Sequence, residues 1–188
     1  MKRTVGVAVA LALTAGLAWA AVRSQDGMPE MPKPQKEHEF LKKFVGTWES
    51  SNKWRMTADE KWMESKSIET NRMVGGFWLI SEAKGDMGPG MTFEGLGSTG
   101  YDSYKKKYVC TWVDSMNPSL NVGEGTMDAA GKVLTTTIQG TDCSTGKPCT
   151  MRMTQEFKDN DTLVWSMFMT GKDGKEFEAM KAESKRKK

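Results

Sequence analysis

Residues 149–170 read CTMRMTQEFKDNDTLVWSMFMT, two alternating runs joined by a polar break. Met151 and Met153 share one parity in the first run, and Met167 and Met169 share one parity in the second. A period of two is typical of a strand with one buried face, and Asp and Asn favour a turn between strands. The stretch therefore predicts an antiparallel hairpin that carries its four methionines on one face.

Strand-like runs of this kind fill the chain from residue 45 onward, separated by short breaks rich in Gly, Pro, Asn and Asp. We place them at 45–56, 62–74, 77–84, 91–101, 107–114, 120–128, 133–141, 149–157, 162–170 and 175–184. No helical stretch long enough for a parallel crossover lies between them. Twist and exposed edges favour closure of so long a sheet. The expected fold class is all-β, a single up-and-down antiparallel β-barrel of about ten strands.

A short helix is expected immediately before the first strand, at 35–44. Phe40, Leu41 and Phe44 would share one apolar face of that helix, and Gly46 would end it.

The N-terminal residues 1–20 resemble a cleavable signal peptide. Two basic residues precede an uncharged apolar run at 5–17, and Ala18 and Ala20 are small residues of the kind that signal peptidase reads. The apolar run is shorter than the roughly 20 residues of a membrane-spanning helix, although an uncleaved N-terminal anchor is the alternative. We expect cleavage after Ala20 and an exported protein, periplasmic or secreted.

The expected exported chain has two parts, a flexible Pro/Met-rich tether at 21–34 and a barrel domain at 35–188 with a basic C-terminal tail. The whole chain has 27 basic residues, two of which lie in the signal segment, against 24 acidic residues. A nearly neutral exported chain gives no support for nucleic acid as a partner. No later segment is apolar enough for stable membrane insertion, and the oligomeric state stays open.

Three cysteines are present, and two of them flank a Gly/Pro turn. Cys143 and Cys149 are close enough in sequence for a disulfide across a hairpin in an oxidising compartment. Cys110 is expected to be a buried thiol within its strand.

Gly46-Thr47-Trp48, after a short helix and at the start of the first strand, resembles the Gly-x-Trp opening of lipocalins and fatty-acid-binding proteins, the calycins. The resemblance implies a lipocalin-like barrel. It also implies that Trp48 closes one end of the barrel beneath a basic side chain of the last strand, for which Arg186 or Lys185 is the candidate.

A wider set of motifs resembles the uncharacterised bacterial domain-of-unknown-function family numbered 1579. The motifs are Glu37-His38 with Leu41, Gly46 with Trp48, Gly75-Gly76 with Trp78-Leu79, Glu94-Gly95, Gly100-Tyr101-Asp102, Lys107-Tyr108, Trp112 with Asp114-Ser115, and Glu124-Gly125. Members of that family look like calycin-type barrels, and the resemblance implies no particular activity.

Histidine-assisted catalysis is disfavoured, because His38 is the single histidine and lies in the expected helix. Carboxylate chemistry is the enzymatic alternative, with Glu94, Asp114 and Glu124 on the central strands and Asp102 beside them. It would require two of these carboxyl groups to face one cavity. An enzyme is the less favoured class, and we expect no resident cofactor.

The favoured hypothesis is a non-catalytic protein that holds a small apolar molecule inside the barrel. Large apolar side chains with strand parity are the candidates for the ligand-binding wall: Trp54, Trp112, Trp165, Met151, Met153, Met167 and Met169. The chain has 15 methionines, and thioethers are soft ligands that select Cu(I). Extracytoplasmic Cu(I) binding is therefore the second hypothesis, although methionine is more often an adaptable core filler, and we assign no metal ligands.

Overall fold

The computed structural model describes residues 31–86, 90–142 and 145–188. The chain divides after Lys33, and every described helix and strand lies in the unit Pro34–Lys188. These elements are α1 (Lys36–Lys42), β1 (Gly46–Trp54), β2 (Met63–Val74), β3 (Trp78–Asp86), β4 (Thr92–Asp102), β5 (Lys107–Asp114), β6 (Asn117–Met127), β7 (Val133–Thr141), β8 (Pro148–Phe157), β9 (Thr162–Thr170) and β10 (Glu176–Arg186).

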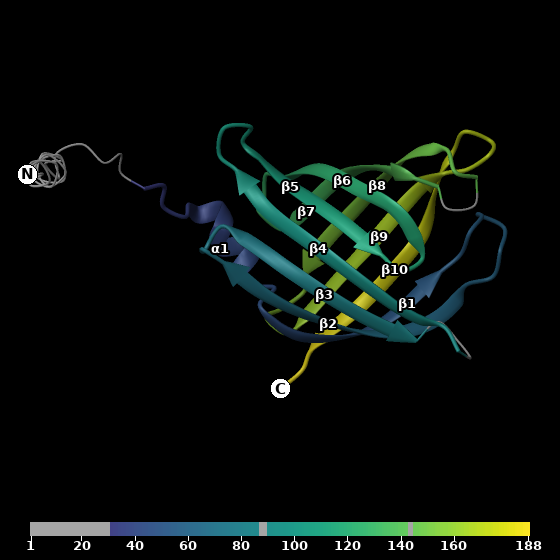
Figure 1. Ribbon diagram of the computed structural model, residues 1–188, viewed down its shortest axis with the longest axis horizontal. Helices are drawn as coiled ribbons and strands as arrows, with labels where there is room; N and C mark the ends of the chain where they lie inside the picture. Colours follow the sequence, from purple (N-terminus) through teal and green to yellow (C-terminus); the bar gives the residue numbers. More distant parts are fainter. Residues whose placement is uncertain (1–30, 87–89, 143–144) are drawn as a thin grey trace, which may run out of the picture. The chain divides into compact units, whose positions relative to one another are not determined.

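The ten strands form a closed barrel in which each strand pairs antiparallel with the next, and β10 returns to pair with β1 (Figure 1). The all-β, up-and-down barrel with one short N-terminal helix is therefore confirmed. The hairpin of β8 and β9 has the expected register, with Met151 opposite Met169 and Met153 opposite Met167. Directly opposite residues share one face of an antiparallel pair, so the four methionines lie together.

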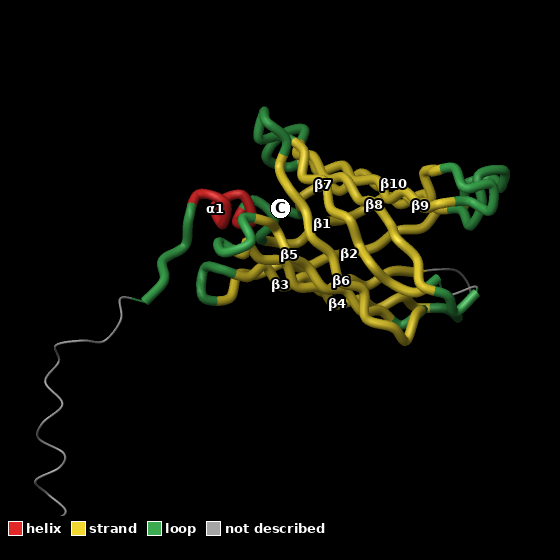
Figure 2. Tube along the Cα trace, turned by 90° about the horizontal axis from the view of Figure 1, so that it is seen from above, coloured by secondary structure: helices red, strands yellow, loops and turns green. Residues whose placement is uncertain are grey.

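Helix α1 lies at one end of the barrel, called here the helix end (Figure 2). It is shorter than the expected 35–44. Its first turn is held by a hydrogen bond in which the backbone N–H of Gln35 donates to His38 Nδ1 at 2.8 Å. His38 is buried, with edge contacts to Phe77 and Tyr101. The histidine thus supports the helix end and does not face the middle of the barrel.

The helix end is filled by a tightly packed apolar cluster. Its buried members are Leu41, Phe44, Trp48, Leu79, Tyr108, Leu134 and Leu163. Trp48 and Leu41 are each 1 % exposed, and the Trp48 Nε1–H donates to the Phe44 carbonyl at 2.7 Å. Burial raises the pKa of Tyr108 to about 12, and its hydroxyl donates to the Glu37 carbonyl. This end of the barrel is a conventional core.

The β5–β6 connection departs from expectation. The Met116-Asn117-Pro118 break predicts a loop, whereas β6 already begins at Asn117. Proline is tolerated there because the β5–β6 register is irregular between Trp112 and Asp114, next to the end of the strand.

Some sequence-based expectations lie outside the described residues. These are the signal segment 1–20, most of the tether 21–34, and Cys143 of the expected disulfide. In the part of the chain that the structure describes, no helix is long and apolar enough to cross a membrane.

Candidate ligand-binding interior of the barrel

An inward-facing apolar surface on β8 and β9 is the first feature of the interior. We call it the methionine wall, and its members are Met151, Met153, Trp165, Met167 and Met169. Met151 and Met153 lie opposite the buried Ile138 and Thr136 of β7, which places both methionines inside the barrel. All five side chains remain half-buried. Water therefore reaches this surface, in contrast to the helix end.

Met180 extends the wall onto β10, and the sequence pattern did not identify it. It lies opposite Met167 on one side and Trp54 on the other. The register of β10 against β9 shifts between Glu178 and Met180. Because of this shift, the inward-facing residues Phe177 and Met180 are three positions apart instead of two. A strict period of two from Phe177 would have placed Met180 outside, so only the pairing reveals it.

Trp112 forms a second aromatic surface, on β5. Its indole lies against Gly95 and Gly97 of β4, where an added Cβ would approach the ring to 2.3 Å and 2.8 Å. Phe93 stacks with the ring at a centroid distance of 6.4 Å, and the indole N–H donates to Asp114 Oδ2 at 2.9 Å. These glycines make room for the indole.

All seven predicted wall residues therefore face the interior. The structure brings five of them together in the methionine wall and joins Trp54 to it through Met180. Trp112 lies apart, because β6 and β7 separate its strand from β8.

Polar inward side chains adjoin the apolar cluster of the helix end. We call this set the polar belt, and its members are Ser50, Glu69, Asn71, Ser81, Thr99, Gln155 and Ser184. Ser50 and Ser184 are opposite each other and share a hydrogen bond of 2.7 Å. A cavity of about 40 Å³ lies at the boundary, lined by Leu41, Phe44, Leu79, Ser81, Thr99, Leu134 and Gln155. Its volume suits a small polar group or an ordered water.

Glu69 is the charged member of the polar belt. It lies opposite Trp48 on β1 and Ala83 on β3, and its carboxylate accepts a 2.7 Å hydrogen bond from Asn71 Nδ2. Burial raises the pKa of Glu69, and the Asn71 hydrogen bond only partly offsets this effect. The carboxyl group is thus largely removed from bulk water, although the residue keeps partial exposure.

Sequence reasoning missed Glu69 because β2 reverses the usual alternation. Ile68, the one aliphatic residue in the middle of the strand, points outward and is 45 % exposed, while its polar neighbours point inward. The usual rule, that the apolar face of a strand points into the barrel, therefore selects the wrong face of β2. No strand pattern signalled Glu69; the pairing of the consecutive strands β1 and β2, across the connection 55–62, sets it opposite Trp48.

The carboxylates proposed for catalysis do not converge. Glu94 points outward and pairs with Lys84 at 3.0 Å, and Glu124 points outward between Lys105 and Lys107. Asp102 accepts backbone hydrogen bonds in a turn. Only Asp114 faces inward, and its carboxylate already accepts hydrogen bonds from the Trp112 indole N–H and from two backbone N–H groups. The two-carboxylate geometry required by the enzymatic alternative is absent from these four residues.

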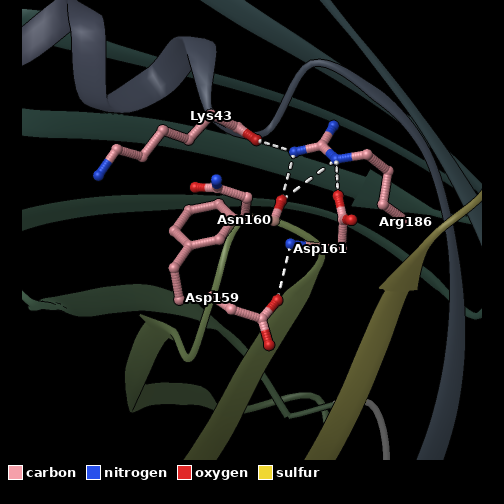
Figure 3. A pocket seen from close by; sticks show the side chains of 6 residues that line it. Lys43, Asp159, Asn160, Asp161 and Arg186 are labelled. Carbon is pink, nitrogen blue, oxygen red and sulfur yellow. Dashed lines mark hydrogen bonds and ion pairs between the residues drawn. The ribbon is translucent and has the colours of Figure 1, made fainter.

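Arg186 closes the outside of the helix end, where its guanidinium group lies among Lys43, Asn160 and Asp161 (Figure 3). The guanidinium carbon of Arg186 lies 4.2 Å from the centre of the Trp48 ring. Arg186 also donates to the carbonyls of Lys43, Val45 and Asn160 and to the Asp161 carboxylate. Lys185 instead points away and contacts Thr162 and Glu183.

Gly46 permits this arrangement. Its φ is +119°, and a Cβ there would lie 3.1 Å from an Arg186 guanidinium nitrogen. The adjoining cleft of about 320 Å³ is lined by Lys43, Phe157, Asp159, Asn160, Asp161 and Arg186. Because Arg186 is already fully engaged, we assign this cleft to barrel closure.

Clusters of three or more His, Cys, Asp or Glu with metal-binding geometry are absent among the described residues. Burial raises the pKa of the inward Cys110 thiol, which keeps it in the protonated form.

Fold and interior together define a closed up-and-down β-barrel with a packed helix end and a water-accessible, methionine-lined half. The chain belongs to the family described as "Protein of unknown function (DUF1579)", which it matches over residues 33–186. No protein of curated function matches it in sequence.

Two solved structures share the barrel. Rv2717c from M. tuberculosis has 14 % identity and a TM-score of 0.63, covering 83 % of this chain and 100 % of its own. The S-type phycobiliprotein lyase CPES from Guillardia theta has 16 % identity and a TM-score of 0.57, covering 84 % of this chain and 99 % of its own. At these identities the likeness shows the fold alone.

Proposed function

We propose that this protein binds a small, largely apolar molecule inside the barrel, against the methionine wall, without chemical turnover. The observation that carries the proposal is the partial exposure of all five wall side chains, although each of them points inward. In a filled interior such side chains would be buried like those of the helix end. Ligand sites are typically concave and mostly apolar, with a few polar groups that orient the ligand.

The chemistry of the wall also suits a ligand. Methionine side chains are flexible and polarisable, so they adapt to irregular apolar shapes. Trp165 offers a large flat surface between Gln155 and Ala182, its directly opposite neighbours. The few polar groups that would orient a ligand are those of the polar belt.

The test is a fluorescence titration with the neutral lipophilic probe N-phenyl-1-naphthylamine. We expect probe emission to rise and tryptophan emission to fall at micromolar probe concentration. The double variant Met153→Ala, Met167→Ala should change probe affinity by at least about fivefold, roughly 1 kcal/mol. Met116→Ala is the matched control, because Met116 is 50 % exposed in the β5–β6 connection, and its affinity should be unchanged. No probe binding by the wild-type protein would refute the proposal.

Cu(I) binding is the second candidate, and Met180 is the observation that favours it. The register puts Met153, Met167 and Met180 in one row across β8, β9 and β10. Three neighbouring thioethers could together coordinate one soft Cu(I) ion. An anaerobic Cu(I) competition with bathocuproine disulfonate tests it. Stoichiometric binding lost in the triple Met→Leu variant would support this function, and no competition by the wild-type protein would exclude it.

We also propose that the protein acts outside the cytoplasm. The support is the basic, apolar and small-residue order of 1–20. Intact mass and N-terminal sequencing of the natural protein should show a mature chain beginning at Ala21, with Cys143 and Cys149 joined in the oxidised form. A mature chain that retains residues 1–20 would contradict the export proposal.

A further inference from the structure

Two hydrogen-bond acceptors lie side by side in the polar belt, the Glu69 carboxylate and Asn71 Oδ1, and the second of them has no donor among the described residues. Asn71 is 3 % exposed, and its Nδ2 group donates to Glu69. Its Oδ1 atom is buried, and no donor among the described residues reaches it. Buried polar atoms are nearly always paired, because an unpaired one loses its hydrogen bonds to water without replacement. Asn71 therefore offers an unpaired amide oxygen next to the Glu69 carboxylate.

Positive charge is also missing at this place. Along the inward faces of the described strands, Arg186 is the only basic residue. It does not lie next to Glu69, because Trp48 of β1 is opposite Arg186 on one side and Glu69 on the other. All guanidinium nitrogens of Arg186 are used in closing the helix end. The other titratable residues on the inward faces of the described strands are Tyr101, Tyr108, Cys110, Asp114 and Cys149, and none of them is basic.

We propose that the polar belt binds the protonated amine of an amphipathic ligand, with the ammonium donating to the Glu69 carboxylate and to Asn71 Oδ1 and the hydrocarbon lying against the methionine wall. The inference rests on the proposed function and names the class of ligand. It places the charged group next to the apolar cluster of the helix end and the apolar body in the water-accessible half.

The chemistry of the two acceptors favours an ammonium over other head groups. A primary ammonium has three donors and no acceptor, so it can satisfy both oxygens at once. A hydroxyl has one donor and can satisfy only one of them. A carboxylate ligand would place a second negative charge beside Glu69, which is unfavourable in a poorly hydrated site. Burial raises the pKa of Glu69, and a bound cation would offset this effect by stabilising the charged carboxylate.

The experiment displaces N-phenyl-1-naphthylamine with three ligands of equal chain length, decylamine, decanol and decanoate, at pH 7 and below their aggregation concentrations. We expect decylamine to bind at least about tenfold more tightly than decanol. Decanoate should bind more weakly than decanol. Equal or weaker binding of decylamine than of decanol would overturn the inference.

Two variants sharpen the test. Glu69→Gln keeps the shape of the side chain and removes its charge, and it should reduce the preference for decylamine over decanol to within about twofold. Glu82→Gln is the matched control, because Glu82 lies on the outward face of the adjacent β3 and is exposed. The control should keep the full preference. An unchanged preference in Glu69→Gln, with a circular dichroism spectrum like that of the wild type, would also overturn the inference.

The failures of the two proposals are distinguishable. If neither the probe nor any of the three ligands binds, the binding function itself is wrong. If decanol and the probe bind but decylamine has no advantage, the barrel binds ligands and only the role of Glu69 and Asn71 is wrong. If Glu69→Gln does not fold, the ligand series on the wild-type protein decides the question alone.

Discussion

The two halves of this barrel are built from the same alternating strands but have different interiors. At the helix end Trp48 is 1 % exposed and Leu134 is 2 % exposed. In the far half Trp165 and Met153 also point inward, yet both remain half-buried. The difference shows that inward parity alone does not produce a core, and that one barrel can combine a packed half with a half whose inward side chains stay partly exposed.

The physical cause of the difference is the helix. Leu41 and Phe44, in and just after α1, fill the space at one end of the barrel, and the Arg186 side chain covers Trp48 from outside. The far half has no comparable insertion among the described residues, because α1 is their single helix. A barrel of about ten strands is wide enough that its own side chains need help to fill it.

The largest expected effect is on the free energy of unfolding, when the indole of Trp48 at the helix end or that of Trp165 in the far half is removed in separate variants. Trp48→Ala should lower the free energy of unfolding by about 3–5 kcal/mol, because it leaves a cavity in a packed core and an unpaired Phe44 carbonyl. Trp165→Ala should lower it by only about 1–2 kcal/mol, because a half-buried ring has less transfer energy to lose. Urea unfolding followed by circular dichroism measures both values. Equal losses would mean that the far half is also a packed core.

Arg186→Ala should have the next largest effect, a loss of about 2 kcal/mol in unfolding free energy. The substitution removes a cation–π contact and leaves the Lys43 and Val45 carbonyls without their donor. Lys185→Ala is the matched control on the same strand, and it should change stability by less than about 0.5 kcal/mol. Probe affinity should be nearly unchanged in both, since Arg186 lies outside the methionine wall. A loss of probe binding in a folded Arg186→Ala protein would contradict the separation of the two halves.

Without added ligand, Glu69→Gln should stabilise the protein by about 1 kcal/mol at pH 8, because it removes a poorly hydrated carboxylate. The pKa of Glu69 is raised above its ordinary value of 4.5, so the folded chain holds the proton to higher pH than the unfolded chain does. The stabilisation that protonated Glu69 contributes is therefore fully present below pH 4.5, and it is lost as the pH rises through the pKa of Glu69 in the folded state. Thermal melts of both proteins from pH 4 to pH 8 should converge at the acidic end. A constant difference across this range would contradict the assignment.

Glu124→Gln should have the smallest effect on both stability and probe affinity at pH 7. Lys105 and Lys107 lower the pKa of this outward carboxyl group to about 2. Its contribution to stability is therefore present above pH 4.5 and is lost as the pH falls toward 2. Because the group is exposed, probe affinity at pH 7 should stay within about twofold of the wild type. A marked loss of probe binding would place Glu124 in the functional site and revive the enzymatic alternative.

Much of the candidate site could be predicted from particular residues. The alternation of methionines in 149–157 and 162–170 predicted both the hairpin and the wall, because a strand exposes its two faces at strict period two. Trp54 and Trp112 were assigned to the interior in the same way. Met180 could not be found by this rule, since a register shift lies just before it.

The sequence by itself determined the barrel, the family and the composition of the methionine wall. Those properties follow from local patterns and short connections, which fix strand faces and pairing order. Only the tertiary structure decided that one half is packed and the other is accessible, because that depends on how far α1 and Arg186 fill a given volume. Only the register placed Glu69 and Asn71 in the interior, because β2 carries its aliphatic residue on the outer face and its pairing with β1 overrides its pattern.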